Sequence, residues 1–241
     1  GRLALVASAA LAFVTVAIPL QLKQQWITIG WALEGAALAW VFKRIPHRGL
    51  FYSGVALLGA VFVRLALNPE VLVYEPRGSL RILNWYLYAY VLCAAAMFLA
   101  GWFLSKTNDR FAGSLRVSSL LPGAGVVLLF LLLNIEIADF YATGPTIMFR
   151  FGATVAQDLT YTIGWLVFGM GLLAGGITLG NRSARVAAVT LIAVTTFKCF
   201  LYDLSSLEGL ARVGSFVGLA ISLALVSVAL QKFVLKTRTA T

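Results

Sequence analysis

The tetrapeptide Thr28-Ile29-Gly30-Trp31 begins a long apolar stretch, and the same four residues return at Thr162-Ile163-Gly164-Trp165, where they begin another. The sequence numbers of the two copies differ by a constant repeat offset (162 − 28 = 134). In each copy a cation follows the tryptophan at the same spacing: Arg64 (64 − 31 = 33) and Lys198 (198 − 165 = 33). Both cations fall inside apolar runs, where a charge is costly and usually has a reason. The sequence therefore predicts two related membrane units, each with one buried cation.

The composition indicates an integral membrane protein. Of the 241 residues, 61% are hydrophobic and 12% are charged, and the mean hydropathy is +0.91. A soluble globular protein is about half apolar and about a quarter charged. The formal net charge of +10 does not indicate a nucleic-acid partner, because the basic residues lie at the ends of apolar runs rather than on one polar face.

Nearly the whole sequence divides into apolar runs of about 20 residues, the length that crosses a bilayer. Each run must be helical, because lipid offers no hydrogen-bond partner to an open backbone. The predicted fold class is all-α, a polytopic transmembrane helical bundle. Its spans, about eight in number, lie at residues 3–21, 26–42, 49–67, 82–104, 117–139, 159–179, 184–203 and 210–233.

The basic residues assign the two sides of the membrane. An even number of spans puts both termini on one side, and twelve of the 19 basic residues lie there: Arg2, Lys43, Arg44, Arg48, Lys106, Arg110, Arg116, Arg182, Arg185, Lys232, Lys236 and Arg238. Only one acid, Asp109, opposes them. The positive-inside rule therefore predicts that both termini are cytoplasmic.

The repeat sets the predicted domain organisation. At the repeat offset, spans two to four fall on spans six to eight, and both copies cross the membrane in the same direction. They are therefore parallel repeats rather than inverted ones. The first repeat comprises residues 1–116, with spans one to four, and the second repeat comprises residues 117–241, with spans five to eight. Spans one and five correspond only if the connection 140–158 is an insertion.

Six charged residues form a candidate intramembrane polar site: Glu34, Arg64, Glu136, Asp139, Lys198 and Asp203. Glu34 lies near the middle of its span, where a carboxyl group is neutral, paired or facing water. It is either a proton, cation or polar-substrate site or a structural link between helices. Arg64 and Lys198 either extend to the interface or join the acids in a cluster. Such a cluster would suit an anionic headgroup, a sugar phosphate or a coupling ion.

Two local patterns indicate architecture rather than chemistry. Asp203 and Arg212 flank a tight helical hairpin and can pair across it, and Ser205-Ser206-Leu207-Glu208 predicts a capping box at the start of the last span. Residues with GxxxG spacing predict close helix contacts, at Gly171 and Gly175 and at Gly214 and Gly218.

Several kinds of site are absent from the sequence. His47 is the only histidine and lies in a basic cytoplasmic connection. A haem site with two histidines, an HExxH zinc site and a Ser-His-Asp triad are therefore unavailable within this chain. Neither GxxxxGK[ST] nor GxGxxG occurs, so nucleotide binding has no support. Cys93 and Cys199 lie in apolar runs and are interpreted as packing thiols. We expect no cofactor and no metal.

Residues 198–204, KCFLYDL, followed by Leu207, Gly209, Arg212 and Phe216, resemble the C-terminal end of a family of bacterial multi-pass membrane proteins of unknown function (domain of unknown function 2339). Trp31-Ala32-Leu33-Glu34 resembles another helix of that family, and Asn134-Ile135-Glu136 is a weaker match. The resemblance implies a bacterial inner membrane. Family members are typically much longer, which together with the initial glycine implies the C-terminal portion of a longer chain, or a short member. The family implies no activity.

Two functions remain open at this point. The first is transport or translocation of an envelope lipid, a glycan precursor or a small solute. The second is a non-catalytic scaffold or accessory subunit of a larger membrane complex. A membrane enzyme is less favoured, because acids such as Asp158, Asp203 or Glu208 would have to act at the outer surface and no spacing selects a pair. The expected partners are membrane lipids and either other membrane subunits or the rest of a longer chain.

Overall fold

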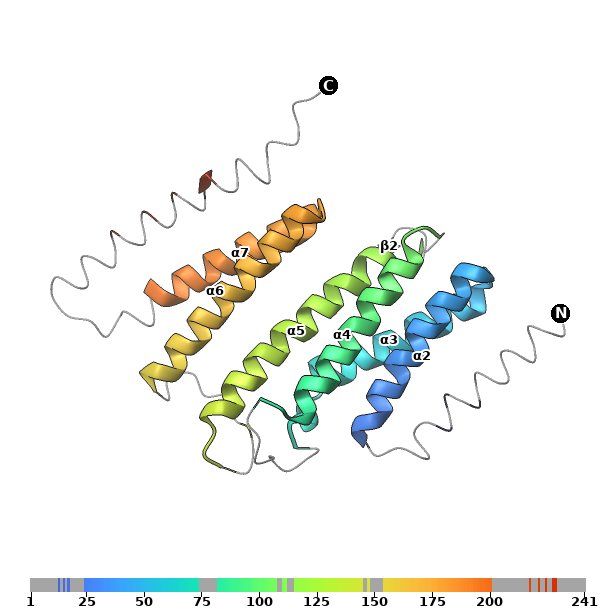
Figure 1. Cartoon of the computed structure of the whole chain (residues 1–241), viewed down its shortest axis with the longest axis horizontal. Coiled ribbons are helices and arrows are strands. Elements are labelled where there is room, and N and C mark those ends of the chain that lie inside the picture. The colour runs from blue at the N-terminus through green and yellow to red at the C-terminus, as the bar shows by residue number, and fades with distance from the viewer. Residues whose placement is uncertain are drawn as a thin grey trace, which may run out of the picture. The chain divides into compact units, whose positions relative to one another are not determined.

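The computed structural model describes residues 24–73, 82–107, 110–111, 115–144, 147 and 154–200, together with residues 13, 15, 17, 217, 221, 224, 227 and 228. Within these residues the long elements are helices: α2 (Gln24–Arg44), α3 (Arg48–Leu67), α4 (Trp85–Leu104), α5 (Val117–Tyr141), α6 (Val155–Thr178) and α7 (Arg182–Lys198) (Figure 1). The short elements are the 3-10 helix η1 (Pro69–Val73) and an antiparallel pair of two-residue strands, β1 (Arg110–Phe111) and β2 (Leu115–Arg116).

The helical membrane character predicted from the sequence is confirmed. Four of the helices, α3, α4, α5 and α6, are long and apolar enough to cross a membrane. Of the other two, α7 has 17 residues, and α2 carries Glu34 at its centre and two cations in its last turn. The predicted first and last spans, 3–21 and 210–233, lie almost entirely outside the described residues.

Capping side chains fix where the helices begin. An N-cap side chain that accepts a hydrogen bond from the first turn satisfies a backbone donor that the helix itself leaves open. Four helices begin this way, α3 after His47, α4 after Asn84, α6 after Thr154 and α7 after Asn181. The fourth predicted span therefore starts at residue 85 rather than 82, because Asn84 is the cap. The seventh span is predicted to run to residue 203: the α-helical part, α7, ends at Lys198, residues 199 and 200 continue as π-helix, and residues 201–203 lie outside the described residues.

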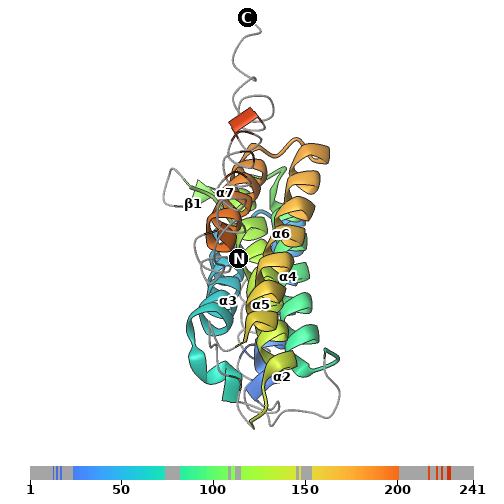
Figure 2. The ribbon, with the colours of Figure 1, turned by 90° about the vertical axis from the view of Figure 1, so that its left-hand side faces the viewer.

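Helices α2 to α5 belong to one compact unit, Gly1–Met148. Within it, α4 packs between α2 and α5, and α3 packs on α2 and touches α5. Figures 1 and 2 show α3 on one face of the layer that the other three helices form. Helices α4 and α5 are tightly packed at Gly101, where a Cβ would lie 2.8 Å from the ring of Pro122. Large side chains such as Tyr90 and Met97 fill the core.

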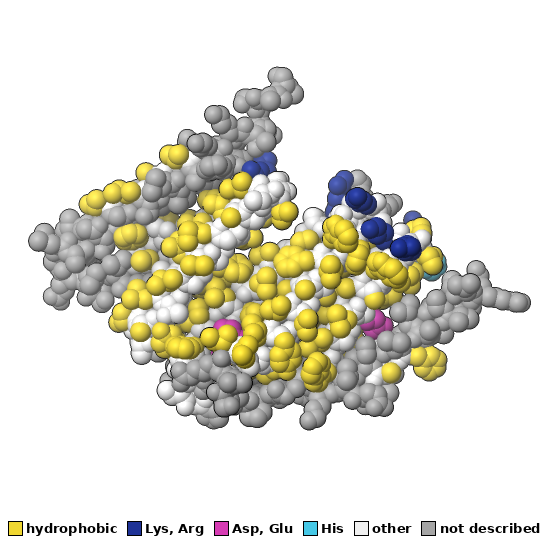
Figure 3. Space-filling model, in the orientation of Figure 1, with side chains coloured by type: hydrophobic (Ala, Val, Ile, Leu, Met, Phe, Trp, Pro, Cys, Tyr) yellow, Lys and Arg dark blue, Asp and Glu magenta, His cyan; other side chains and the backbone are white. Residues whose placement is uncertain are grey.

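Basic side chains gather at one end of this first unit (Figure 3). That is the end where α2 and α4 finish and where α3 and α5 begin. The exposed cations there are Lys43, Arg44, Arg48, Lys106 and Arg116. Along the helices the visible surface is mostly apolar (Figure 3). Half-exposed apolar side chains of the first unit include Leu33, Val63 and Leu99. A belt of this kind is typical of a surface in contact with lipid.

Helices α6 and α7 belong to the second compact unit, Phe149–Thr241. They form a hairpin whose tight turn contains Gly180, with a positive φ of 63° that suits glycine. The helices approach closely at Gly169 and Gly176, where a Cβ would lie 2.8 Å from Ile192 and 2.9 Å from Arg185. Of the two GxxxG pairs named from the sequence, Gly214 and Gly218 lie outside the described residues. The other pair differs from Gly169 and Gly176: within the described residues, nothing lies within 4 Å of a Cβ at Gly171 or Gly175.

Candidate functional site

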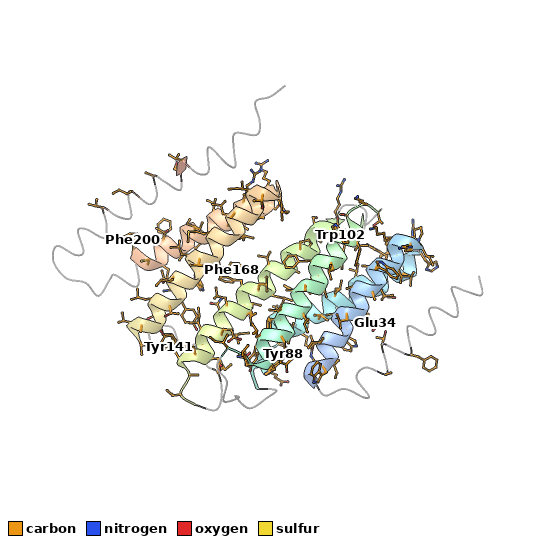
Figure 4. The ribbon with its side chains drawn as sticks, in the orientation of Figure 1. Glu34, Tyr88, Trp102, Tyr141, Phe168 and Phe200 are labelled. Atoms are coloured by element: carbon orange, nitrogen blue, oxygen red, sulfur yellow. The ribbon has the colours of Figure 1, made fainter. Side chains whose placement is uncertain are left out.

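Glu34 is a buried acid in the middle of α2 (Figure 4). Its side chain is 8% exposed, and its Oε1 accepts a hydrogen bond from the hydroxyl of Thr15. In the described part of the chain, Oε2 of Glu34 has no hydrogen-bond partner, and neither has Nε1 of Trp31, one turn earlier on the same helix. A carboxyl group among apolar helices is costly unless its oxygens are satisfied. The open oxygen therefore marks a place that suits a proton, a cation or a polar ligand.

A small pocket next to α2 is apolar. Its lining comes from α2, α3 and the end of α4: Ala39, Leu50, Phe51, Gly54, Val55, Leu58 and Leu104. Glu34 does not contribute to it. This pocket therefore supplies packing space between helices and no polar path to the carboxyl group.

The second polar site joins the start of α4 to the end of α5. The amide nitrogen of Asn84 lies 3.2 Å from Oε2 of Glu136 and 3.5 Å from Oδ2 of Asp139. Its amide oxygen accepts from the backbone nitrogen of Leu87 at 3.0 Å, which caps α4. Among the described residues, Oε1 of Glu136 is buried without a hydrogen-bond partner. One asparagine side chain thus starts a helix and holds two carboxyl groups beside it.

The third polar site lies in the second unit, between the end of α7 and the first turns of α6. The Nζ of Lys198 lies 2.8 Å from Oγ1 of Thr162 and 3.3 Å from the backbone carbonyl oxygen of Asp158. Oγ1 of Thr162 lies 3.1 Å from the same carbonyl oxygen. Thr162 and Asp158 are both buried, each 8% exposed. The hairpin thus places hydrogen-bond acceptors of one helix opposite the cation of the other.

The structure describes five of the six predicted residues, and these five lie on four helices. The structure brings Glu136 and Asp139 together on α5, whereas Glu34 lies on α2 and Arg64 lies half-buried in the last turn of α3. Lys198 belongs to the second unit. Asp203 and the pair it was expected to form with Arg212 lie outside the described residues.

The sequence did not select three residues that complete these sites: Thr15, Asn84 and Thr162. Thr162 opens the second copy of the repeated tetrapeptide, and Asn84 directly precedes an apolar run, as an N-cap does. The sequence therefore contains a signal for Thr162 and for Asn84, but it does not show which residues of a neighbouring helix they contact. Within the described residues, no three side chains of His, Cys, Asp and Glu are grouped as a metal site would require.

Comparison with known families agrees with a membrane protein. The model of a family described as "Predicted membrane protein (DUF2339)" matches residues 2–155 and residues 43–233, which together span nearly the whole chain. The chain belongs to this family. The resemblance predicted from its residues is thereby confirmed. No curated protein matches the chain, and no solved structure matches it. The family description therefore identifies this DUF2339 chain as a membrane protein and names no activity.

Proposed function

We propose that this DUF2339 protein is a bacterial inner-membrane protein of eight spans in two parallel repeats, residues 1–116 and 117–241. In this proposal it transports or translocates an envelope lipid, a glycan precursor or a small solute. The observation that carries the transport role is Glu34, a buried acid with one oxygen unpartnered among the described residues. Intramembrane acids of this kind commonly belong to ion or substrate pathways.

Matching helix boundaries support the two repeats. Helix α2 ends at Arg44 and α6 ends at Thr178, which are separated by the repeat offset (178 − 44 = 134). The next helices are capped by His47 and Asn181, which are separated by the same offset (181 − 47 = 134). Neither pair of residues was used to find the repeated tetrapeptide, so the agreement is independent of it.

The interior of the two hairpins matches as well. A Cβ on Gly35 would lie 2.7 Å from Cγ of Leu58, between α2 and α3. A Cβ on Gly169 would lie 2.8 Å from Cγ1 of Ile192, between α6 and α7. Both partners are related by the same offset (169 − 35 and 192 − 58 are both 134). The overlap of the two family matches, residues 43–155, is also expected when a stretch fits repeated parts of one model.

The charge distribution supports the proposed orientation. The exposed cations of the first unit gather where α2 and α4 end, the end that lies on the same side as both termini in an eight-span arrangement. Basic residues favour the cytoplasmic side. In this proposal both termini are cytoplasmic.

The repeat also supports a functional rather than a purely architectural role for Glu34. Its counterpart in the second hairpin is Phe168 (168 − 34 = 134) (Figure 4). The hairpin therefore forms with an apolar residue at this position. The acid is present in only one copy, where its Oε2 is buried without a hydrogen-bond partner among the described residues. A function that this copy alone performs accounts for the acid.

The alternative is a scaffold or accessory subunit. The hydrogen bond between Thr15 and Glu34 favours it, because a carboxyl group that links two segments of one chain has a structural use. In this role the partners are other membrane subunits or the rest of a longer chain. Replacing Glu34 would then change stability or assembly and nothing else.

Native mass spectrometry of the gently extracted protein, comparing wild type with Glu34→Gln, separates these functions. Gln keeps the size of the side chain and removes its ability to ionise. The transport role predicts a retained lipid or glycan adduct on the wild type that Glu34→Gln loses while its melting temperature stays the same. The matched control is Glu70→Gln, the same change at an exposed acid in η1, which should keep the adduct.

The contrary result is equally specific. If Glu34→Gln changes only the melting temperature or the mass of the assembly, the scaffold role is supported and the transport role is wrong. An adduct that both variants keep also removes Glu34 from the mechanism.

A further inference from the structure

In the first unit, α4 covers one stripe of α2. The ring of Trp26 stacks on Tyr88 with centroids 5.8 Å apart, and at the other end of α2 the Nζ of Lys43 lies 5.1 Å from the centroid of the Trp102 ring. Between these contacts, the stripe of α2 that lies in line with Lys43 at helical spacing is buried. Its residues and their exposed fractions are Ile29 4%, Ala32 0% and Ala36 8%.

The corresponding stripe of α6 is apolar and uncovered within the described residues. At the repeat offset its members are Ile163, Leu166 and Met170, and their exposed fractions are 61%, 37% and 50%. The other contact face of α6 matches its counterpart, because Gly169 is buried against α7 as Gly35 is against α3. Among its described residues the second unit therefore has a counterpart of α3, which is α7, and no helix in the position of α4.

Contact with lipid does not account for this difference. A position that faces lipid should be exposed in both hairpins, and the pair Leu33 and Val167 behaves this way, with exposed fractions of 55% and 58%. These two residues lie next to Ala32 and Leu166 in the sequence, on another side of each helix. Only the stripe that α4 covers in the first unit changes from buried to exposed in the second.

The chain itself is long enough to supply the missing helix. The last residue of α4 is Leu104, whose counterpart is Arg238 (238 − 104 = 134), and the chain continues to Thr241. Three described residues of the last predicted span, Ala224, Ser227 and Val228, are helical and exposed. Their counterparts on α4 are Tyr90, Cys93 and Ala94, with exposed fractions of 1%, 0% and 1%. Both sides of the contact are therefore apolar or weakly polar surfaces that are buried in the first unit and open in the second.

We propose that the last span, within residues 210–238, packs parallel to α6 on the stripe Ile163, Leu166 and Met170, through the side that carries Ala224, Ser227 and Val228. The register is that of the first unit, in which Sγ of Cys93 lies 3.9 Å from the carbonyl oxygen of Thr28. Ser227 then lies beside Thr162. This inference rests on the two-repeat architecture proposed above and is independent of transport.

Pairs of cysteines in the full-length protein in its native membrane test the contact. In a background with Cys93→Ala and Cys199→Ala, the test pair is Leu166→Cys with Ser227→Cys, and the control pair is Val167→Cys with Ser227→Cys. A disulfide requires Cα atoms within about 7 Å, so only a residue on the covered stripe can link. After mild oxidation, the test pair should form the intramolecular disulfide several-fold faster than the control pair, at the mass of one chain.

Three results would overturn the proposal. If the control pair links at the rate of the test pair, the proposed contact is wrong. It is also wrong if neither pair links in variants that elute like the wild type. Linkage of the test pair only at the mass of two chains assigns the stripe to a second copy instead. Because oxidation is measured without any substrate, these results stay separate from the outcome for Glu34→Gln.

Discussion

The ammonium group of Lys198 and the hydroxyl oxygen of Thr162 lie 2.8 Å apart, across the hairpin of α7 and α6. The carbonyl oxygen of Asp158, 3.3 Å from the same nitrogen, completes the contact. Lys198 is the last residue of α7, and Thr162 is the first residue of the repeated tetrapeptide. The cation and the motif that the sequence identified separately are therefore parts of one contact between two helices.

Replacing Thr162 by valine should weaken this hairpin. Valine has nearly the shape of threonine and no oxygen, so Lys198 loses one acceptor while packing is retained. Hydrogen bonds between membrane helices contribute on average about 0.6 kcal/mol, and those to charged groups contribute more. We expect Thr162→Val to lower the free energy of unfolding by about 1 kcal/mol, measured by titration of the micellar protein with a denaturing detergent.

Thr160→Val is the matched control. Both hydroxyls bond back to a carbonyl oxygen four residues earlier on α6, Thr160 to Ala156 at 2.8 Å and Thr162 to Asp158 at 3.1 Å. The two variants therefore lose the same contact within the helix and differ in the contact with Lys198. Equal loss of stability in the two variants would show that the bond to Lys198 contributes nothing.

The case of Lys198 shows how far the sequence alone reaches. Hydropathy and charge placed this cation near the end of an apolar helix, and α7 does end there. Its partner could not be predicted, because that depends on how two helices are rotated against each other. The two open alternatives were extension to the interface and a cluster of charges. The structure shows hydrogen bonds to a hydroxyl and a backbone carbonyl of the neighbouring helix.

Substitutions at Asn84 should differ in stability in an order that is unusual for an N-cap. Aspartate is as good an N-cap as asparagine in most helices, and serine is nearly equal. Here the amide nitrogen of Asn84 donates toward Glu136 and Asp139, so Asn84→Asp would place a third carboxyl group beside two others. We therefore expect Asn84→Asp to be less stable than Asn84→Ser by about 1 kcal/mol or more, measured as the free energy of unfolding at neutral pH.

Acidification is the internal control for this order. Protonation removes the repulsion among the carboxyl groups, so lowering the pH should shrink the difference between Asn84→Asp and Asn84→Ser. A difference that stays constant with pH would mean that repulsion is not its cause. If Asn84→Asp is as stable as Asn84→Ser at neutral pH, a charge at position 84 does not interact with Glu136 and Asp139.

The sequence selected Glu136 and Asp139 for their charge and passed over Asn84, although a single amide joins them. The partner lies 52 residues from Glu136 in the chain, and the packing of α4 on α5 creates the contact. An uncharged residue at the edge of an apolar run carries only a capping signal. That signal predicts where α4 begins, and it contains no information on which carboxyl groups the free end of the amide meets.

Glycine-to-alanine substitutions along α6 give the last prediction. Spacing alone selected Gly171, where a Cβ would meet no described atom within 4 Å. Gly169 fits no such motif, yet a Cβ there would lie 2.8 Å from Ile192. We expect Gly169→Ala to lower the free energy of unfolding by about 1–3 kcal/mol through overpacking. Gly171→Ala should be neutral or stabilising, because alanine is the better helix former. Detergent unfolding of both variants decides the matter: a larger loss for Gly171→Ala would mean that spacing, and not the α6–α7 contact, identifies the tight position.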